Sequence, residues 1–164
     1  LANTLQVDLA FVVETEFRAM GPEFTLVSGS ARKAMPMAGP ATGYLIGFGW
    51  LYALHARSSI ARGKLWQAEY MISGMRDTAL SLACVRHGLP ASLGRGLDGL
   101  PGEVSGAFAD SLVRGIDQAE LARAFVAAVC VLMAEIRLAD AEVAARLEDA
   151  MVQLAETRFA PHMG

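Results

Sequence analysis

The sequence predicts a mainly α-helical protein, in which a bundle of about five helices follows two short strands. Apolar residues alternate with other residues over Leu5–Val13, and from Thr42 onward they recur at helical spacing. The stretch SARKAMPMAGP between these regions contains prolines and a glycine that interrupt both periodicities, so a connector is expected there. We therefore expect a partial α/β region at 1–40 and a helical domain at 41–164.

The two strands are predicted near residues 5–13 and 23–28. In LQVDLAFVV every second residue from Leu5 is apolar, which is the period of a half-buried strand, and Asp8 lies on the other face. The segment FTLVSG follows a turn-rich stretch and has the length of a second strand. Because two strands alone do not make a stable sheet, we interpret them as the end of a sheet that begins upstream of Leu1.

Helices are predicted at about 42–61, 63–87, 102–115, 117–138 and 140–158. The most hydrophobic run, GYLIGFGWLYALHA, is shorter than the ~20 residues of a membrane span and holds three glycines. Of these, Gly43 and Gly47 are expected to allow close helix approach. The run is expected to be a buried helix. His87 and Gly88 suit a helix C-terminus, whereas Asp117 and Asp140 suit N-caps. Glu120, three residues after Asp117, completes the spacing of a capping box.

Composition excludes several classes of partner. A net charge of −3 and a pI near 5.6 provide no basic field for a nucleic acid backbone or an anionic membrane, so neither is expected. Cys84 and Cys130 lie in apolar helical patterns without metal-ligand spacing. They are predicted to be buried free thiols in a reducing compartment, which indicates a cytoplasmic protein without a zinc site.

The stretch RGKLWQAEYMISGMRD, which opens the second predicted helix, has two unlike faces. At about 100° per residue one stripe is apolar and belongs to a core: Leu65, Ala68, Ile72, Met75, Ala79 and Leu82. The opposite stripe combines aromatic, polar and charged side chains: Trp66, Glu69, Tyr70, Ser73, Arg76 and Asp77. This second face is either solvated surface or the wall of a site for a polar ligand.

The order of QVDLAFV, GPEFTLVSG and a bundle whose second helix opens RGKLWQAEYMISGMRDTALSL resembles the downstream half of small nucleotidyltransferases of the DNA polymerase beta superfamily. The similarity is greatest to bacterial adenylyltransferases of the kanamycin, lincosamide and streptomycin type, and it spans most of the chain. Its most distinctive motif is RGKLWQAE with Arg76 and Asp77 following. The resemblance implies transfer of a nucleoside monophosphate from ATP to a hydroxyl of a small polar molecule, such as an aminoglycoside-like antibiotic.

In such enzymes three carboxylates on adjacent strands hold two Mg²⁺ ions, which bridge the nucleoside triphosphate. Two of these carboxylates come from an Asp-x-Asp pair that follows a Gly-Ser motif. The third lies on a strand that matches VDLAF, so the resemblance assigns metal binding and catalysis to Asp8. The sequence has no Asp-x-Asp pair after Gly29 and Ser30 or elsewhere. We expect the chain as given to be inactive in nucleotide transfer unless an upstream segment or a partner supplies those carboxylates.

By the same resemblance, the helical domain binds the acceptor, with its site on the polar face of the second helix. Glu69 is either a catalytic group that acts on the acceptor hydroxyl or an ion-pair partner. Arg62 and Lys64, where the first helix turns into the second, either bind the nucleotide or are solvated charges.

Four further side chains are candidates for binding the substrate. Trp66 and Tyr70 either contact the ligand or cover the rim of the core. Arg76 lies seven residues from Glu69, too far for the usual helical ion pair, so each is expected to find a partner elsewhere. His55 is either a core histidine or part of the site.

Two functions therefore remain open. The chain is the acceptor-binding part of an adenylyltransferase, or it is a non-catalytic helical partner in a two-component, toxin–antitoxin-like nucleotidyltransferase system. A helical RNase of the second class would carry an Arg followed by four to six residues and a His, and that spacing is absent from the sequence. The positive mean hydropathy also predicts surface that another subunit covers, as in a homodimer.

Overall fold

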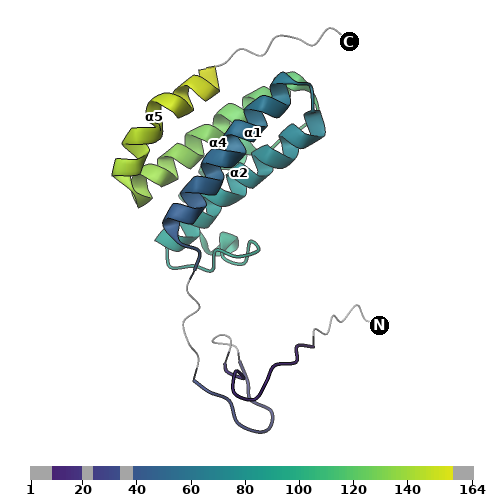
Figure 1. The fold of residues 1–164 in the computed structure, drawn as a ribbon, viewed down its shortest axis with the longest axis vertical. Coiled ribbons are helices and arrows are strands. Elements are labelled where there is room, and N and C mark those ends of the chain that lie inside the picture. The colour runs from purple at the N-terminus through teal and green to yellow at the C-terminus, as the bar shows by residue number, and fades with distance from the viewer. Residues whose placement is uncertain (1–8, 20–23, 34–38, 157–164) are drawn as a thin grey trace. The chain divides into compact units, whose positions relative to one another are not determined.

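The structure is a computed structural model that describes residues 9–19, 24–33 and 39–156 (Figure 1). The chain consists of two compact units, Leu1–Ala38 and Gly39–Gly164. In the first unit Arg18 and Arg32 form an isolated parallel bridge. Around it, the Arg32 amide donates to the Phe17 carbonyl at 3.1 Å, and the Ala19 amide donates to the Arg32 carbonyl at 3.2 Å.

The two predicted strands are not confirmed. Their described parts, residues 9–13 and 24–28, contain no strand, and the remaining positions lie outside the described residues. Phe11 and Val27 are each 94% exposed. Alternation indicates a segment that fits a half-covered sheet, but a strand also needs a neighbouring strand and a core to cover its apolar face. The described residues of this unit supply neither.

The second unit is a helix bundle. Its α-helices in the described part of the chain are α1 Thr42–Ala61, α2 Leu65–Arg86, α3 Gly102–Ala107, α4 Gln118–Ala139 and α5 Ala141–Glu156. The mainly helical class and the number of helices are thus as predicted. α1 and α2 are consecutive and pack along each other, while α4 packs against α1, α2 and α5 (Figure 1).

The core of the bundle lies along α4. Its Phe125, Leu132 and Ile136 are fully buried and belong to one cluster with the apolar stripe of α2. That stripe is buried as predicted, except that Leu65 at its start is only partly covered. Gly49 brings α1 close to α4, because a Cβ atom there would lie 2.8 Å from Cδ1 of Leu132.

The third predicted helix, 102–115, is shorter than expected. α3 ends at Ala107, and a 3₁₀ turn over Ala109–Ser111 follows it. Two of the six residues of α3 are glycines, which have low helix propensity. In addition, the buried Ser111 hydroxyl donates to the Phe108 carbonyl at 2.6 Å, which stabilises a turn in place of a longer helix.

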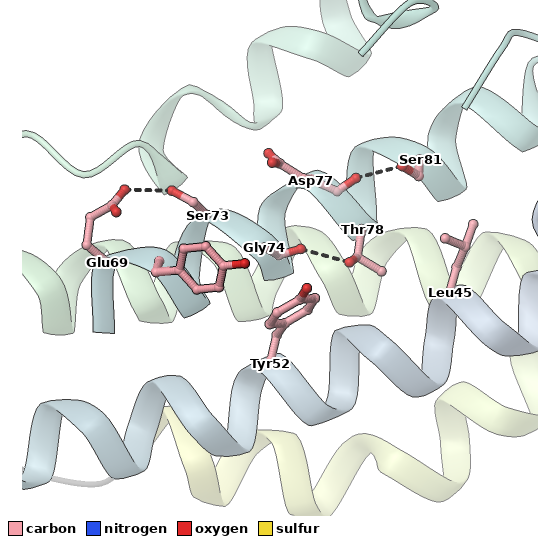
Figure 2. Close-up of a pocket in the computed structure, with 9 residues that line it drawn as sticks. Leu45, Tyr52, Glu69, Ser73, Gly74, Asp77, Thr78 and Ser81 are labelled. Carbon is pink, nitrogen blue, oxygen red and sulfur yellow. Dashed lines mark hydrogen bonds between the residues drawn. The ribbon is translucent and has the colours of Figure 1, made fainter. Parts of the chain in front are cut away.

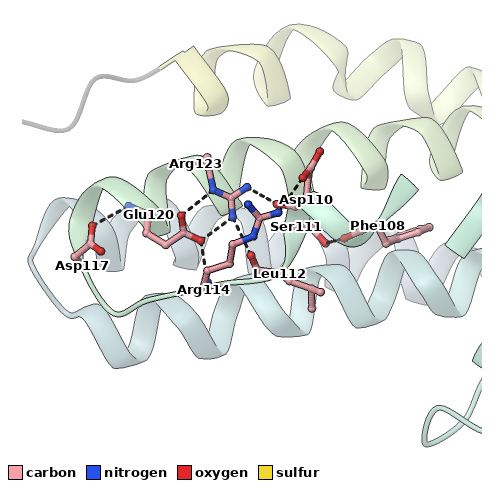
Figure 3. A network of polar contacts seen from close by, with 8 residues as sticks. All are labelled: Phe108, Asp110, Ser111, Leu112, Arg114, Asp117, Glu120 and Arg123. Carbon is pink, nitrogen blue, oxygen red and sulfur yellow. Dashed lines mark hydrogen bonds and ion pairs between the residues drawn. The ribbon is translucent and has the colours of Figure 1, made fainter. Parts of the chain in front are cut away.

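The first turn of α4 is tied to the preceding loop by a charged network (Figure 3). Asp117 is the predicted N-cap and accepts from the Glu120 amide at 2.9 Å; Asp140 caps α5 in the same way at 3.0 Å. The Glu120 carboxylate does not complete a capping box, since it accepts from the Arg114 amide at 2.8 Å and from the Arg123 guanidinium at 2.7 and 2.8 Å. Hydrogen bonds from Arg123, and then from the Arg114 backbone, lower the pKa of Glu120 to about 2.

A partly buried ion pair, in which Glu135 is buried and Arg86 reaches the surface, joins α2 to α4. Glu135 is 6% exposed, and its two oxygens accept from Nε and Nη2 of Arg86 at 3.1 and 3.0 Å. Arg86 is the last residue of α2, whose C-cap is His87, as predicted. Gly88 follows with φ +67°, the left-handed conformation that favours glycine after a helix.

α1 is only half buried, contrary to the expectation that its apolar run is covered on all sides. The face away from the core exposes Tyr44, Phe48, Leu51 and Leu54, with exposed fractions of 37 to 60%. An apolar composition all round predicts full burial only where neighbouring elements surround the helix, and the other described helices pack on one side of α1. No helix in the described ranges is long and apolar enough to cross a membrane.

The two cysteines have different environments. Cys84 is buried as predicted, and its burial raises the pKa of the thiol. Cys130 is exposed, contrary to the prediction. It lines an apolar groove between α4 and α5. The residue is exposed because the side of α4 that carries it is apolar but is only partly covered by α5.

Candidate functional site

The polar face of α2 lines a pocket against α1 (Figure 2). The pocket has a volume of about 370 Å³. Its lining residues are Leu45, Tyr52, Glu69, Tyr70, Ser73, Gly74, Asp77, Thr78 and Ser81. Of the six residues in the predicted polar stripe, Glu69, Tyr70, Ser73 and Asp77 are thus brought together.

Helical spacing builds one wall of this pocket. Glu69, Ser73, Asp77 and Ser81 follow each other at intervals of four residues, so they form one line along α2. The Ser73 hydroxyl donates to Oε1 of Glu69 at 2.7 Å, which orients that carboxylate. The Ser81 hydroxyl lies 2.8 Å from the Asp77 carbonyl and 3.1 Å from the carbonyl of Ala91, and therefore links the far end of the wall to the loop after α2.

The opposite wall depends on a close approach between α1 and α2. The ring of Tyr52 on α1 points at Gly74 on α2 (Figure 2). A Cβ atom on Gly74 would lie 2.7 Å from Cε1 of Tyr52, which is too close for real carbon atoms. Glycine at this position therefore makes room for the ring. The Gly74 carbonyl accepts a hydrogen bond from the Thr78 hydroxyl at 2.7 Å.

Carboxylates dominate the charge of the pocket. Glu69 and Asp77 are the charged side chains among the described residues that line it. Asp77 is partly compensated by Arg76, whose Nη2 lies 3.2 Å from its Oδ1. The Asp77 side chain is 67% exposed, so this ion pair is screened by water and leaves the carboxylate accessible. The pocket is therefore suited to a ligand that carries positive charge and hydrogen-bond donors.

The predicted nucleotide-binding residues lie elsewhere. Arg62 is the C-cap of α1, and its Nε donates to the Ser58 carbonyl at 3.2 Å. Lys64 is the N-cap of α2 and is exposed. Neither side chain lines the pocket. They occupy the turn between the two helices, where at least the Arg62 side chain has a structural partner.

Three predicted substrate-binding residues also lie outside the pocket lining. Trp66 is 75% exposed, so it is not a core aromatic. Arg76 pairs with its neighbour Asp77 on α2. His55 is exposed, which corrects its interpretation as a core histidine: α1 turns this position away from α2 and α4.

The predicted metal ligand, Asp8, lies outside the described residues. In the described ranges, no group of three or more His, Cys, Asp or Glu side chains is close enough to hold a metal ion. The Mg²⁺ ions and ATP that the resemblance implies therefore remain predictions.

Sequence reasoning missed the contribution of α1 to the pocket. Leu45 and Tyr52 line it, although neither belongs to the polar stripe of α2. The signal was Gly74, a glycine inside a helix next to polar residues, because such a position marks the close approach of another group. Ser81 was detectable as the continuation of the four-residue spacing beyond Asp77.

A comparison of this chain with protein-family models, curated proteins and solved structures finds no match.

Proposed function

We propose that the helical unit binds a small, positively charged molecule rich in hydroxyl and amino groups, as the acceptor-binding part of a nucleotidyltransferase. The observation that carries this proposal is the pocket between α1 and α2, in which Glu69 and Asp77 stand beside Tyr52 and Tyr70. A volume of about 370 Å³ matches a ligand of one or two saturated rings.

The four side chains have complementary roles in this proposal. Glu69 uses one oxygen to accept from Ser73, which leaves its other oxygen for an ammonium or hydroxyl group of the ligand. Asp77, two helical turns further along α2, attracts positive charge of the ligand. The faces and hydroxyl groups of Tyr52 and Tyr70 supply apolar contact and hydrogen bonds at the same time.

Nucleotide transfer extends the proposal beyond the pocket. The acceptor hydroxyl oxygen would form a bond to the α-phosphorus of ATP, the bond from that phosphorus to pyrophosphate would break, and Glu69 would take the hydroxyl proton. Asp8 would be one of the Mg²⁺ ligands, together with carboxylates that this sequence does not contain. This part rests on the resemblance of QVDLAFV and RGKLWQAE to adenylyltransferases.

Binding is tested with 2-deoxystreptamine, a cyclic diamine with several hydroxyl groups, and with its di-N-acetylated form. In isothermal titration calorimetry the diamine is expected to bind, with an affinity that falls as salt is added, because the contact is between charges. The acetylated form should bind at least about tenfold more weakly, a loss of about 1.4 kcal/mol.

Variants separate the pocket from general attraction to an acidic protein. Glu69→Gln and Asp77→Asn should each weaken binding of the diamine, whereas Glu103→Gln on the exposed surface of α3 should leave it unchanged. Equal binding of both ligand forms, or equal effects of all three substitutions, contradicts the proposal. For the transfer step, Asp8→Asn should abolish incorporation of labelled AMP in a chain joined to an Asp-x-Asp strand, while leaving the helical content unchanged.

A further inference from the structure

Trp66 continues the pocket-lining face of α2 toward the start of the helix. At about 100° per residue, its direction from the helix axis falls between those of Ser73 and Asp77, which both line the pocket. Tyr70, which also lines the pocket, follows Trp66 by four residues, so the two aromatic side chains are neighbours on the helix surface. The face that lines the pocket therefore extends one helical turn beyond the pocket itself.

Within the helical unit, the two rings at this end of the face are open to solvent. Trp66 is 75% exposed and Tyr70 is 66% exposed. Among the described residues, neither belongs to the core cluster or to the side chains packed against it, and neither packs on another aromatic ring. Trp50, the other tryptophan, does pack against the core. Exposed aromatic rings beside a polar pocket are typical of binding sites, because they supply a large contact area to a ligand.

The charge on this face selects the kind of ring that Trp66 binds. Glu69 follows Trp66 by three residues and is therefore its neighbour on the helix surface. Lys64 precedes Trp66 by two residues, so these two side chains do not face each other. The face of the indole is itself negative and attracts ammonium groups. Trp66 beside Glu69 thus suits a saturated ring with amino groups better than a group that carries phosphate.

We propose that Trp66 forms a second subsite, which binds a second ring of the ligand that occupies the pocket. The first ring lies in the pocket against Glu69 and Asp77. The second, a saturated ring with hydroxyl and amino groups, stacks on the indole beside Tyr70. This inference rests on the proposed function and adds to it the size of the ligand, which contains at least two linked amino-bearing rings. Trp66 then distinguishes such a ligand from a single ring.

The test compares 2-deoxystreptamine with neamine, in which a diamino sugar is joined to the same ring, by isothermal titration calorimetry of the whole chain. Trp66→Ala should weaken binding of neamine by roughly threefold to tenfold, because the stacked ring loses its contact. Binding of 2-deoxystreptamine should be unchanged. Leu138→Ala removes an exposed apolar side chain of α4 and should affect neither ligand. Trp66→Phe keeps an aromatic ring and should recover part of the loss.

Fluorescence shows where the second ring lies. In a Trp50→Phe variant, Trp66 is the sole tryptophan of the two in the sequence. Acrylamide should quench its emission in the free chain, and neamine should protect it whereas 2-deoxystreptamine should not. An indole that is shielded from acrylamide in the free chain overturns the inference, because another segment of the chain then covers the ring. Protection by AMP but not by neamine also overturns it, because Trp66 then stacks on a base.

Failure of this inference differs from failure of the proposed function in the same titrations. If 2-deoxystreptamine binds but Trp66→Ala weakens neamine no more than Leu138→Ala does, the second subsite is wrong and the pocket proposal stands. If neither ligand binds the wild-type chain, the proposed function is wrong, and the second subsite is wrong with it.

Discussion

Replacing Gly74 by alanine is expected to displace Tyr52 and to destabilise the bundle by about 1 kcal/mol. The new Cβ atom would lie 2.7 Å from Cε1 and 2.8 Å from Cζ of the ring, whereas carbon atoms in contact are ~3.5–4.0 Å apart. The ring must therefore move by about 1 Å. Such overpacking costs about 1–3 kcal/mol, and alanine returns about 1 kcal/mol through its higher helix propensity.

The clash is measured by urea unfolding of four proteins: wild type, Gly74→Ala, Tyr52→Ala and the double variant. In the Tyr52→Ala background the added methyl group meets no ring, so Gly74→Ala should stabilise the protein there. The coupling energy between the two substitutions is then about 1–3 kcal/mol, which is the clash itself. Gly106→Ala, which meets no neighbouring atom, measures the propensity gain alone. The reasoning is refuted if Gly74→Ala stabilises wild type as much as it stabilises Tyr52→Ala.

Three further predictions concern polar groups outside the pocket. Arg86→Ala should lower the free energy of unfolding by about 3 kcal/mol, because it leaves the buried carboxylate of Glu135 unpaired; a loss below about 1 kcal/mol in urea unfolding contradicts the role of this ion pair. Ser59→Ala should raise stability by about 1 kcal/mol, because its hydroxyl is fully buried and has no hydrogen-bond partner in the described part of the chain; a lower midpoint would show that the hydroxyl has a partner. Glu120→Gln should destabilise the protein near neutral pH. Since the pKa of Glu120 is lowered to about 2 in the folded chain and is ~4.3 in an unfolded one, its contribution is present above about pH 4.5 and is lost as the pH falls through about 2. The difference between wild type and variant should therefore shrink over that range, and a constant difference contradicts the assignment.

Local signals in the sequence account for most of the helix boundaries. The apolar stripe of α2 and the caps at Asp117 and Asp140 act within a few residues of the chain, and the structure agrees with each. The helix expected at 102–115 is an exception, because competing turn contacts such as that of Ser111 are not visible in periodicity. The strand expectations are not confirmed in residues 9–13 and 24–28 for a related reason: a strand depends on a partner that periodicity does not identify.

Only the wall of the candidate site that α2 forms can be predicted from the sequence. Helical spacing places Glu69, Ser73 and Asp77 in one line whatever the rest of the fold is. Tyr52 joins them only because α1 packs closely on α2. No local pattern in the sequence identifies which helices pack against each other. Arg62 shows the same dependence on tertiary structure, because a cation at a helix end can bind a nucleotide or donate to nearby carbonyl groups, and in the structure it donates to the Ser58 carbonyl.

Tyr44, Phe48 and Tyr52 form one row of rings along α1, and this row ends at the pocket. The centroids of neighbouring rings are 4.5 and 6.2 Å apart. Tyr52 lines the pocket, whereas Tyr44 and Phe48 are exposed side chains of α1. A ligand that shifts Tyr52 therefore acts on Phe48 by direct contact. Thermodynamic linkage then requires that any partner whose binding over Phe48 depends on the position of Tyr52 changes ligand affinity by the same factor by which the ligand changes binding of that partner.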